Sequence, residues 1–568
     1  MLNLKSKMKT ALILSLTLLL SGSLMAQDLA QGIKLTRSEQ FDAAKSVFDK
    51  LIAAEPNNGD NYFYYGENYL MSHFADTISV LLTDVTGPAA QLFKKGTELD
   101  PENPLCYIGL GKVALMTGAT ADAVNNFNMA LSKLPSKTNK TSTLSPERQA
   151  LTYAKIAEAM IQPKIKTTAK ALELVTKAGE LDTKNPEIFL IWGDVFLENN
   201  DGSSAIAKYK VAQELDPQSP SAKLRLGKLW VRARNWTEAI NYYNEAIEID
   251  ASFAPAYVEL GAIYMRAGQA AKAKTYFEKY LELSNAISAK VKYLSVLLEL
   301  KDYTAAIPVA LEIKQADPNR NDISRALAYC YFETKNYAKA LEYMELFFAN
   351  AKPEKIINSD YVYYGDILSK NKKDSLAILQ YTKVLELDST AYEMYSNIAE
   401  SHKSMKNNEK AVEWYNKKKV LGKMTVVDWY KFGMLYYNIA AVSMQEADWK
   451  MADTIFAEIT STRPDFMGGK SHLWRGRCNS NLDTDLSKGL ANIHYQNYIQ
   501  IAVADSVKNA KDLIEAYDYF QYYYLKNKDY CNAKLYVERI LWTDPEGKIA
   551  DIPKFQDLLS EYTKNCQK

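Results

Sequence analysis

The chain has only four histidines, so any histidine-dependent catalysis or metal binding must use His73, His402, His472 or His494. None of them belongs to an H-E-x-x-H sequence, and no Cys or His pair has the spacing of a structural zinc site. His472 and His494 flank an irregular segment, and we interpret them as surface histidines. The histidines therefore predict no metal centre.

Two glycine-containing segments resemble nucleotide-binding motifs only in part. Gly109-Leu110-Gly111 begins like a dinucleotide fingerprint, but no strand precedes it. Gly469-Lys470-Ser471 resembles the end of a P-loop, but Pro464 stands where that motif needs its first glycine. Neither segment predicts a nucleotide cofactor.

An acidic segment imitates a calcium loop and fails at two required positions. Asp317, Asn319 and Asn321 have the right spacing, but the sixth position is Asp322 instead of Gly and the twelfth is Ala328 instead of Glu. No serine lies in a nucleophile elbow either. The sequence therefore predicts a protein that is not an enzyme and carries no cofactor or metal.

The N-terminal segment 1–26 has the order and length of a secretory signal peptide. A basic start, MLNLKSKMK, precedes an apolar run, TALILSLTLLL, which is too short to span a bilayer. We expect cleavage between Ala26 and Gln27. Ser23 stands where a bacterial lipoprotein would carry its lipidated cysteine, so we expect an exported, periplasmic protein without a lipid anchor or a membrane span.

Composition and charge favour a folded chain with protein partners. Of its 568 residues, 47% are hydrophobic and 24% are charged, and the formal net charge is +1. Removing the signal peptide takes away three lysines and leaves a net charge of −2. A nearly neutral protein has no overall field that attracts nucleic acid, so no nucleic-acid partner is expected.

A period of 34 residues organises the rest of the chain. Three equally spaced columns share it in the centre of the sequence: Gly193, Gly227 and Gly261; Ala205, Ala239 and Ala273; and Tyr209, Tyr243 and Phe277. Small residues allow two helices to cross closely, and the aromatic residue fills the gap between neighbouring repeats. A proline that follows the Ala column, as Pro217 follows Ala205, is expected to end the second helix and open the next.

These columns resemble the tetratricopeptide repeat. The clearest unit contains Trp192-Gly193, Phe196, Ala205, Tyr209 and Pro217. The resemblance covers nearly all of the chain after the signal peptide, with about a dozen units, and implies an all-α fold. That fold is a superhelical α-solenoid of paired helices with a ligand groove, and a C-terminal helix that caps the stack.

Departures from the period divide the chain. After the signal peptide at 1–26 we expect N-terminal repeats with an insertion at 27–135, a polar loop at 136–148 and a central array at 149–462. Irregular C-terminal repeats follow at 463–546, and a capping helix with a tail at 547–568. Ser145-Pro146 has the residue types of an N-cap and a first helical position, which predicts a helix start there.

Five cysteines in an exported protein leave at least one unpaired. Cys106 and Cys330 fall on apolar helix faces, where a cysteine acts as a small core residue. Cys531 and Cys566 are placed so that a disulfide would hold the last helix, but the sequence leaves that pairing open.

In tetratricopeptide proteins the first helix of each repeat lines the groove, chiefly at offsets −3, +1, +4 and +5 from the Gly column. Carried over to this sequence, the resemblance implies a groove of mixed charge with many aromatics. Its predicted partner-binding residues are Leu224, Lys228, Arg232, Arg266, Arg325, Tyr329, Phe332, Tyr430, Met434 and Tyr437.

These features predict a non-enzymatic scaffold of the bacterial cell envelope that binds segments of partner proteins in its groove. The partners would be components of an envelope or outer-membrane complex. The alternative is a periplasmic binding module for a glycan, a peptidoglycan fragment or another small ligand.

Overall fold

A computed structural model describes residues 28–136, 139–161 and 167–566. Within these ranges the chain is built from α-helices with two short 3₁₀ turns, and no β-strand occurs. The predicted signal peptide and its expected cleavage site between Ala26 and Gln27 lie outside the described residues. The all-α solenoid expected from the repeat is therefore confirmed.

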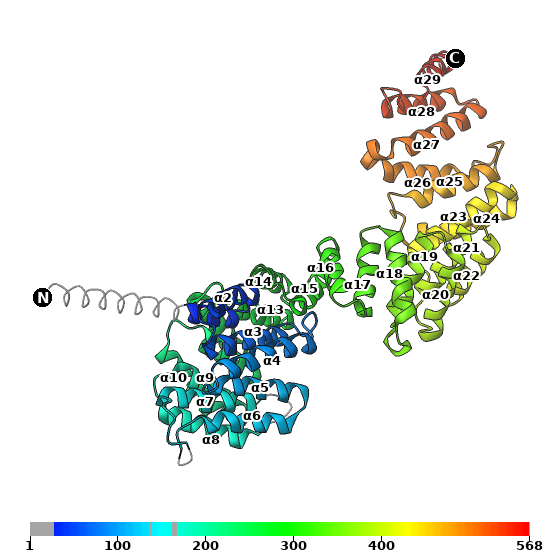
Figure 1. Ribbon diagram of the computed structural model, residues 1–568. Coiled ribbons are helices and arrows are strands. Elements are labelled where there is room, and N and C mark those ends of the chain that lie inside the picture. Colours follow the sequence, from blue (N-terminus) through cyan, green and yellow to red (C-terminus); the bar gives the residue numbers. More distant parts are fainter. Residues whose placement is uncertain (1–27, 137–138, 162–166, 567–568) are drawn as a thin grey trace. The chain divides into compact units, whose positions relative to one another are not determined.

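The chain divides into two compact units, with the boundary between Asn336 and Tyr337. Unit 1 begins with a helix over residues 28–37. Its further helices are α2(Phe41–Ala54), α3(Gly59–Ala75), α4(Leu82–Leu99), α5(Pro104–Thr117), α6(Thr120–Ser132), α7(Pro146–Met160), α8(Thr168–Leu181), α9(Pro186–Glu198), α10(Gly202–Leu215), α11(Ser221–Arg232), α12(Trp236–Ile249), α13(Ala254–Arg266), α14(Ala270–Leu283), α15(Ile287–Glu299), α16(Tyr303–Ala316) and α17(Asn321–Glu333) (Figure 1).

Unit 2 contains the remaining helices and ends in the disulfide-linked C-terminal segment. Its helices are α18(Tyr337–Asn350), η1(Pro353–Lys355), α19(Asn358–Lys370), α20(Asp374–Leu387), α21(Glu393–Ser404), α22(Asn408–Val420), α23(Val426–Ser443), α24(Glu446–Thr462), α25(Lys470–Leu482), α26(Asn492–Ala502), η2(Val503–Asp505), α27(Ser506–Lys526), α28(Tyr530–Thr543) and α29(Ile552–Cys566). The boundary between the units falls inside the central array that the sequence predicts as continuous.

The Gly and aromatic columns pack against each other within one repeat. A Cβ on Gly193 in α9 would lie 2.3 Å from the ring of Tyr209 in α10, and Gly227 stands in the same relation to Tyr243. Tyr209 and Tyr243 are fully buried. The glycine therefore provides the space for the ring of its own helix pair, whereas the sequence analysis placed that ring between neighbouring repeats.

The proline column has a different role from the one expected. Pro217 lies in the turn between α10, which ends at Leu215, and α11, which begins at Ser221. Pro217 follows the end of α10, as expected, but it does not open α11. Ser145 does cap α7 as expected: its hydroxyl accepts a hydrogen bond from the backbone N–H of Arg148, and Pro146 is the first helical residue.

The irregular spacings correspond to long helices. The stretch between Tyr69 and Ala89 is absorbed by α3 and α4, which have 17 and 18 residues. Gly433 and Ala452 stand 19 residues apart, whereas Gly193 and Ala205 are 12 apart, and α23 and α24 likewise have 18 and 17 residues. In these repeats the extra residues therefore lengthen the helices.

The cysteines separate into a disulfide and three buried thiols. Cys531 of α28 and Cys566 of α29 are bonded, with their Cα atoms 4.9 Å apart, so the last helix is held to the preceding one. Cys106, Cys330 and Cys478 are buried and free. In the described part of the chain no helix combines the length and apolar character needed to cross a membrane.

Candidate functional site

The first helices of unit 1 bond to repeats that lie far along the chain. Lys34 pairs with Asp250 at 3.0 Å, and Arg37 pairs with Glu187 at 2.8 Å. The hydroxyl of Tyr280 donates to Glu39 at 2.7 Å, a bond between positions 241 residues apart in the sequence. These contacts close the helices of unit 1 around a central space.

Asp76 completes this closure at the end of α3. Its carboxylate accepts hydrogen bonds from the backbone N–H groups of Ile287 and Ser288 at 2.6 and 3.1 Å. The Ser288 hydroxyl donates to the Ala75 carbonyl at 2.9 Å. A carboxylate at a helix N-terminus satisfies donors that have no partner inside the helix, so Asp76 caps α15 across 211 residues of sequence.

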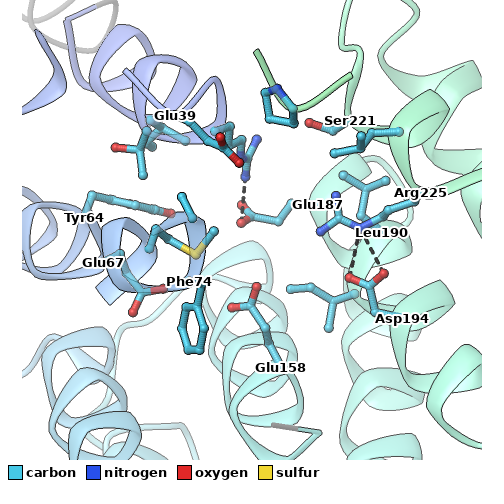
Figure 2. Close-up of a pocket in the computed structure, with 18 of the residues that line it drawn as sticks. Glu39, Tyr64, Glu67, Phe74, Glu158, Glu187, Leu190, Asp194, Ser221 and Arg225 are labelled. Carbon is cyan, nitrogen blue, oxygen red and sulfur yellow. Dashed lines mark hydrogen bonds and ion pairs between the residues drawn. The ribbon is translucent and has the colours of Figure 1, made fainter. Parts of the chain in front are cut away.

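A cavity of about 430 Å³ lies in this central space. The helix over 28–37 and α2, α3, α7, α9, α11 and α13 all contribute to its wall. Figure 2 shows charged side chains and apolar side chains converging on it, among them Glu39, Tyr64, Phe74 and Leu190. The volume suits a small organic molecule or one side chain of a larger partner.

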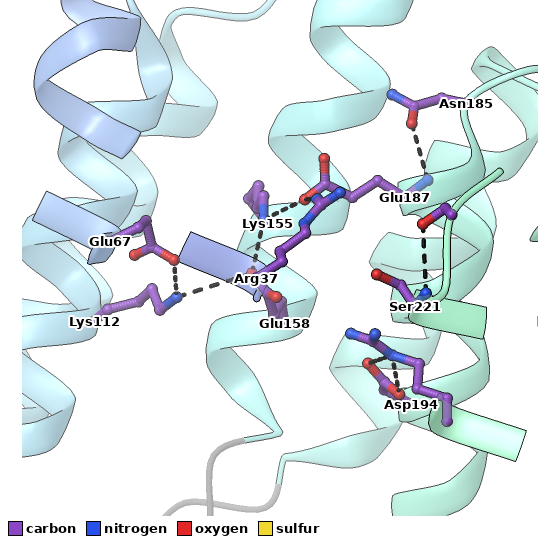
Figure 3. A network of polar contacts seen from close by, with 11 residues as sticks. Arg37, Glu67, Lys112, Lys155, Glu158, Asn185, Glu187, Asp194 and Ser221 are labelled. Carbon is purple, nitrogen blue, oxygen red and sulfur yellow. Dashed lines mark hydrogen bonds and ion pairs between the residues drawn. The ribbon is translucent and has the colours of Figure 1, made fainter. Parts of the chain in front are cut away.

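The charged residues around the cavity form an ion-pair network between several helices (Figure 3). Glu187 of α9 pairs with Arg37 at 2.8 Å and with Lys155 at 2.7 Å. Lys155 also reaches Glu158 at 3.1 Å. Nearby, Lys112 pairs with Glu67 at 2.5 Å. The side chains of Lys112 and Lys155 are only 7% and 6% exposed. Because a buried charge without a partner is strongly destabilising, the loss of one member of the network would destabilise the fold.

The network controls the ionisation of its carboxyl groups. Burial by itself would raise the pKa of Glu187, but Lys155 and Arg37 outweigh burial and lower it to about 2. Glu158 also has a lowered pKa, because Lys155 and Lys112 outweigh its burial. Glu39 differs: burial is the largest effect and raises its pKa above the ordinary carboxyl value.

A second ion pair joins α9 and α11 in the cavity wall. Arg225 donates to both carboxylate oxygens of Asp194 at 3.0 and 2.9 Å, and Tyr209 donates to the same carboxylate at 2.7 Å. Burial raises the pKa of Tyr209, with Asp194 the next cause. Asp194 thus connects Tyr209, in the core of its repeat, with Arg225 in the cavity wall.

Some of the predicted groove residues line this cavity and others do not. Leu224 and Lys228, at offsets −3 and +1 from Gly227, are in its wall. Arg232 lies outside it and bonds to the carbonyl of Leu197 at 3.1 Å and to Glu198 at 3.5 Å. Arg266, at the end of α13, is exposed.

The remaining predicted groove residues lie on α17 and α23. Arg325, Tyr329 and Phe332 are half-buried on α17, outside the cavity. Tyr430, Met434 and Tyr437 are half-buried on α23 of unit 2. The predicted residues thus belong to both units, and of them Leu224 and Lys228 line the cavity.

The α23 residues belong to an aromatic cluster with α25. The Tyr430 hydroxyl accepts a hydrogen bond from the indole N–H of Trp474 at 2.9 Å, and the Tyr437 ring lies 4.7 Å from the Trp474 ring. The guanidinium of Arg477 lies 4.2 Å from the same ring and pairs with Glu515 at 2.6 Å. The cluster combines aromatic surface with a cation held over a ring.

The interpretation of the two C-terminal histidines as surface residues is wrong. His472 is 7% exposed, and His494 is half-buried. The pKa of His494 is lowered to about 4 by burial first and then by Arg475, while Asp453 opposes the shift and His472 adds to it. Sequence could not reveal this, because α25 and α26 are joined by an irregular loop that hides which faces meet.

The partial motifs are structural elements of the repeats. Gly109 and Gly111 lie inside α5, where a Cβ on either would meet the ring of Phe93 or Phe127. Lys470 is the first residue of α25 and pairs with Asp512. In the described residues no group of three or more His, Cys, Asp or Glu side chains is arranged to hold a metal ion.

Most residues of the cavity wall could not be predicted from the sequence. Arg37, Glu39, Glu67 and Glu187 stand in ordinary helical sequence with no motif around them. These residues come together because the first helices of unit 1 contact its later repeats. Leu224 and Lys228 are the wall residues that the sequence did predict, from their offsets −3 and +1 from Gly227.

Comparison with known proteins agrees with the repeat. Residues 190–255 and 296–351 match one family model described as tetratricopeptide repeat, and residues 254–287 and 392–417 match a second with the same description. No curated protein matches the sequence.

Several solved structures are similar to the chain over part or most of its length. The C-terminal part of a tetratricopeptide repeat-containing protein from Cytophaga hutchinsonii is 29% identical, covering 47% of this chain and 98% of that one, with a TM-score of 0.42. PilF of Pseudomonas aeruginosa is 16% identical, covering 45% and 99%, with a TM-score of 0.25. Yeast Tom70 is 14% identical, covering 78% and 98%, with a TM-score of 0.26.

The matched repeats, the equally spaced columns and the helix pairs packed through them all indicate one family. The chain is a tetratricopeptide-repeat protein.

Proposed function

We propose that this protein is a non-enzymatic scaffold of the bacterial cell envelope that binds segments of partner proteins on the inner face of unit 2. Tetratricopeptide repeats form a protein-interaction fold, because stacked helix pairs create an extended concave surface. The cavity of unit 1 shows which positions face inward: Leu224 and Lys228 at offsets −3 and +1 from their glycine. Tyr430 and Met434 have the same offsets from Gly433, and Arg477 has offset +1 from Gly476.

The observation that carries this proposal is the aromatic cluster of Tyr430, Tyr437 and Trp474 with Arg477. Trp, Tyr and Arg side chains are enriched among the few residues that dominate the binding energy of protein interfaces, where they fill well-packed, desolvated pockets. In unit 1 the equivalent inner positions surround a cavity that the chain's own first helices close. Unit 2 is therefore the better surface for a protein segment.

The envelope location rests on the sequence of the segment 1–26, which has the order of a secretory signal. Export predicts that the mature chain begins at Gln27 and is recovered from the periplasmic fraction. N-terminal sequencing of the protein purified from cells tests this, and an uncleaved cytoplasmic product would contradict it.

Site-specific photocross-linking tests the binding face. A photoreactive amino acid would replace Asn438, which is exposed on α23 at offset +5 from Gly433, and in a control Asn416, which is exposed on the outer helix α22. Illumination of living cells followed by mass spectrometry should identify defined envelope proteins cross-linked from position 438 and not from 416. Equal products from both positions, or none from 438, would refute the proposed face.

The cavity of unit 1 supports a second function. A space of about 430 Å³ lined by both polar and apolar groups suits a small ligand, as in a periplasmic binding module. Most charges of its wall are paired with each other, so the wall offers few of the unpaired donors and acceptors that the hydroxyls of a glycan need. The chemical character of the wall points to a different ligand class.

A further inference from the structure

The charges around the cavity of unit 1 are not balanced. The wall contains five carboxylates and four cations: Glu39, Glu67, Glu158, Glu187 and Asp194, with Arg37, Lys155, Arg225 and Lys228. One of these cations is engaged elsewhere, because the Lys228 ammonium pairs with Glu259 at 3.4 Å and Glu259 is not in the wall. Lys112, which lies behind the wall, partly compensates through its pair with Glu67.

Pairing leaves two carboxylates incompletely satisfied. Glu187, Glu158 and Asp194 each have a lysine or arginine partner within 3.1 Å. Among the described residues Glu39 has no cationic partner within 4.0 Å and accepts its hydrogen bond from the Tyr280 hydroxyl. Glu67 is 8% exposed, and its Oε1 is buried without a hydrogen-bond partner.

A buried carboxylate oxygen without a donor is costly, because the group has lost its hydration and gained nothing in return. Glu67 faces this cost in the wall of a cavity, where a guest molecule can relieve it. The guest must bring hydrogen-bond donors and positive charge. An anion would instead meet the excess of carboxylates.

The apolar part of the wall stands beside these carboxylates. Tyr64, Met71 and Phe74 come from α3, the same helix as Glu67, and Phe74 is 44% exposed. Figure 2 shows Tyr64 between Glu39 and Glu67, with Phe74 beside Glu67. Aromatic faces attract ammonium and guanidinium groups, so aromatic rings next to carboxylates make a recognition site for organic cations.

We infer that this cavity is a binding site for an organic cation of the ammonium or guanidinium type, held by Glu67 and Glu39 against Tyr64 and Phe74. The cation is a free small amine or a lysine or arginine side chain of a partner protein, since both present the same group. The inference goes beyond the scaffold role and does not depend on the inner face of unit 2.

Calorimetric titration of the full-length mature chain tests the ligand class. Butylammonium and butylguanidinium serve as probes, and butylurea is the uncharged control of similar shape. We expect at least one cation to bind about tenfold more tightly than butylurea, a difference set by the charge. Short peptides with one central Lys, Arg or Gln distinguish the sources: tighter binding of the basic peptide than of the free cation assigns a protein side chain, and the reverse assigns a free amine.

Two variants locate the binding. Glu67→Gln retains an oxygen for Lys112 but removes the charge, and it should weaken cation binding about tenfold while leaving butylurea unaffected. Glu214→Gln changes an exposed carboxylate of α10 outside the cavity and should bind like the wild type. Thermal unfolding checks that both are folded, and Glu39→Gln provides a second test if Glu67→Gln is not.

Three results would overturn the inference. They are equal binding of butylurea and the cations, unchanged cation binding by both folded cavity variants, and tighter binding of an anion such as butyrate.

Discussion

At the scale of single residues, the glycine column is the most direct link between sequence and fold. Position 193 needs a glycine because a Cβ there would lie 2.3 Å from the ring of Tyr209. This ring is fully buried and held by Asp194, so it has no space to move aside. The spacing of these columns predicted helix pairs correctly because close packing requires a glycine at one position and an aromatic ring at the other.

We therefore predict that Gly193→Ala destabilises unit 1 by about 1–3 kcal/mol, because overpacking outweighs the gain in helix propensity. Gly202→Ala is the matched control: Gly202 is the first residue of α10, with nothing within 4 Å of the added Cβ, so the change should be neutral or stabilising. Chemical denaturation of the three proteins measures both effects. Equal stabilities of Gly193→Ala and wild type would show that the ring yields.

The buried histidines predict a loss of stability in acid. His494 has its folded pKa lowered to about 4, chiefly by burial, whereas an unfolded histidine titrates near ~6.5. Between these values the unfolded state binds protons that the folded state excludes, so stability is full above pH ~6.5 and falls as the pH drops towards 4. Because His494 is only half-buried, solvent screening reduces the effect, and we expect a loss of roughly 2 kcal/mol over this window, smaller in His494→Gln.

Thermal unfolding of unit 2 as a function of pH measures this effect. Burial and then Arg475 also lower the pKa of His472, so His494→Gln should remove only part of the pH dependence. A wild-type profile that is flat between pH ~7 and about 4 would contradict the assignment of neutral, buried imidazoles.

At the scale of elements, helix boundaries followed from local chemistry and helix lengths did not. Ser145 and Pro146 predicted the start of α7, because the cap and the first position each need particular residue types. The lengths of α3, α4, α23 and α24 were ambiguous, because extra residues lengthen either a helix or a loop. Packing against neighbouring repeats decides between them.

The last element is held by a covalent bond. Cys531 and Cys566 close a segment with a sequence separation of 35, and α29 packs on α28. We predict that reduction, or the Cys531→Ser substitution, destabilises the C-terminal end of unit 2 by about 2–4 kcal/mol. Hydrogen exchange should then increase in α29 and leave unit 1 unchanged. Two freely titrating thiols at these positions in the oxidised protein would contradict the disulfide.

At the scale of the whole molecule, the sequence predicted the solenoid but not the closure of unit 1. The repeat period describes how each repeat contacts the next, and contacts between distant repeats lie outside that description. Glu39, Asp76 and Glu187 are therefore invisible as functional residues until the first helices meet α9, α14 and α15. The cavity exists only because of these contacts.

Asp76 tests that closure. Asp76→Ala removes the cap of α15 and should cost about 1–2 kcal/mol. Hydrogen exchange should increase both in α3 and at the start of α15, two segments joined by a bond across 211 residues of sequence. Asp122→Asn, an exposed acidic residue in the first turn of α6, is the matched control. Increased exchange in α3 alone would mean that the two segments are not coupled.

The central claim is that the inner face of unit 2 binds envelope proteins. Affinity purification of the full-length protein from gently cross-linked envelopes, followed by quantitative mass spectrometry, tests it most directly. Asn438→Arg places a bulky charge on the inner face, and Asn416→Arg places the same charge on the outer helix. We expect a small, defined set of envelope proteins that is retained by Asn416→Arg and lost by Asn438→Arg. Recovery of the same set with both variants, or of the protein alone, would show that the inner face of unit 2 does not bind them.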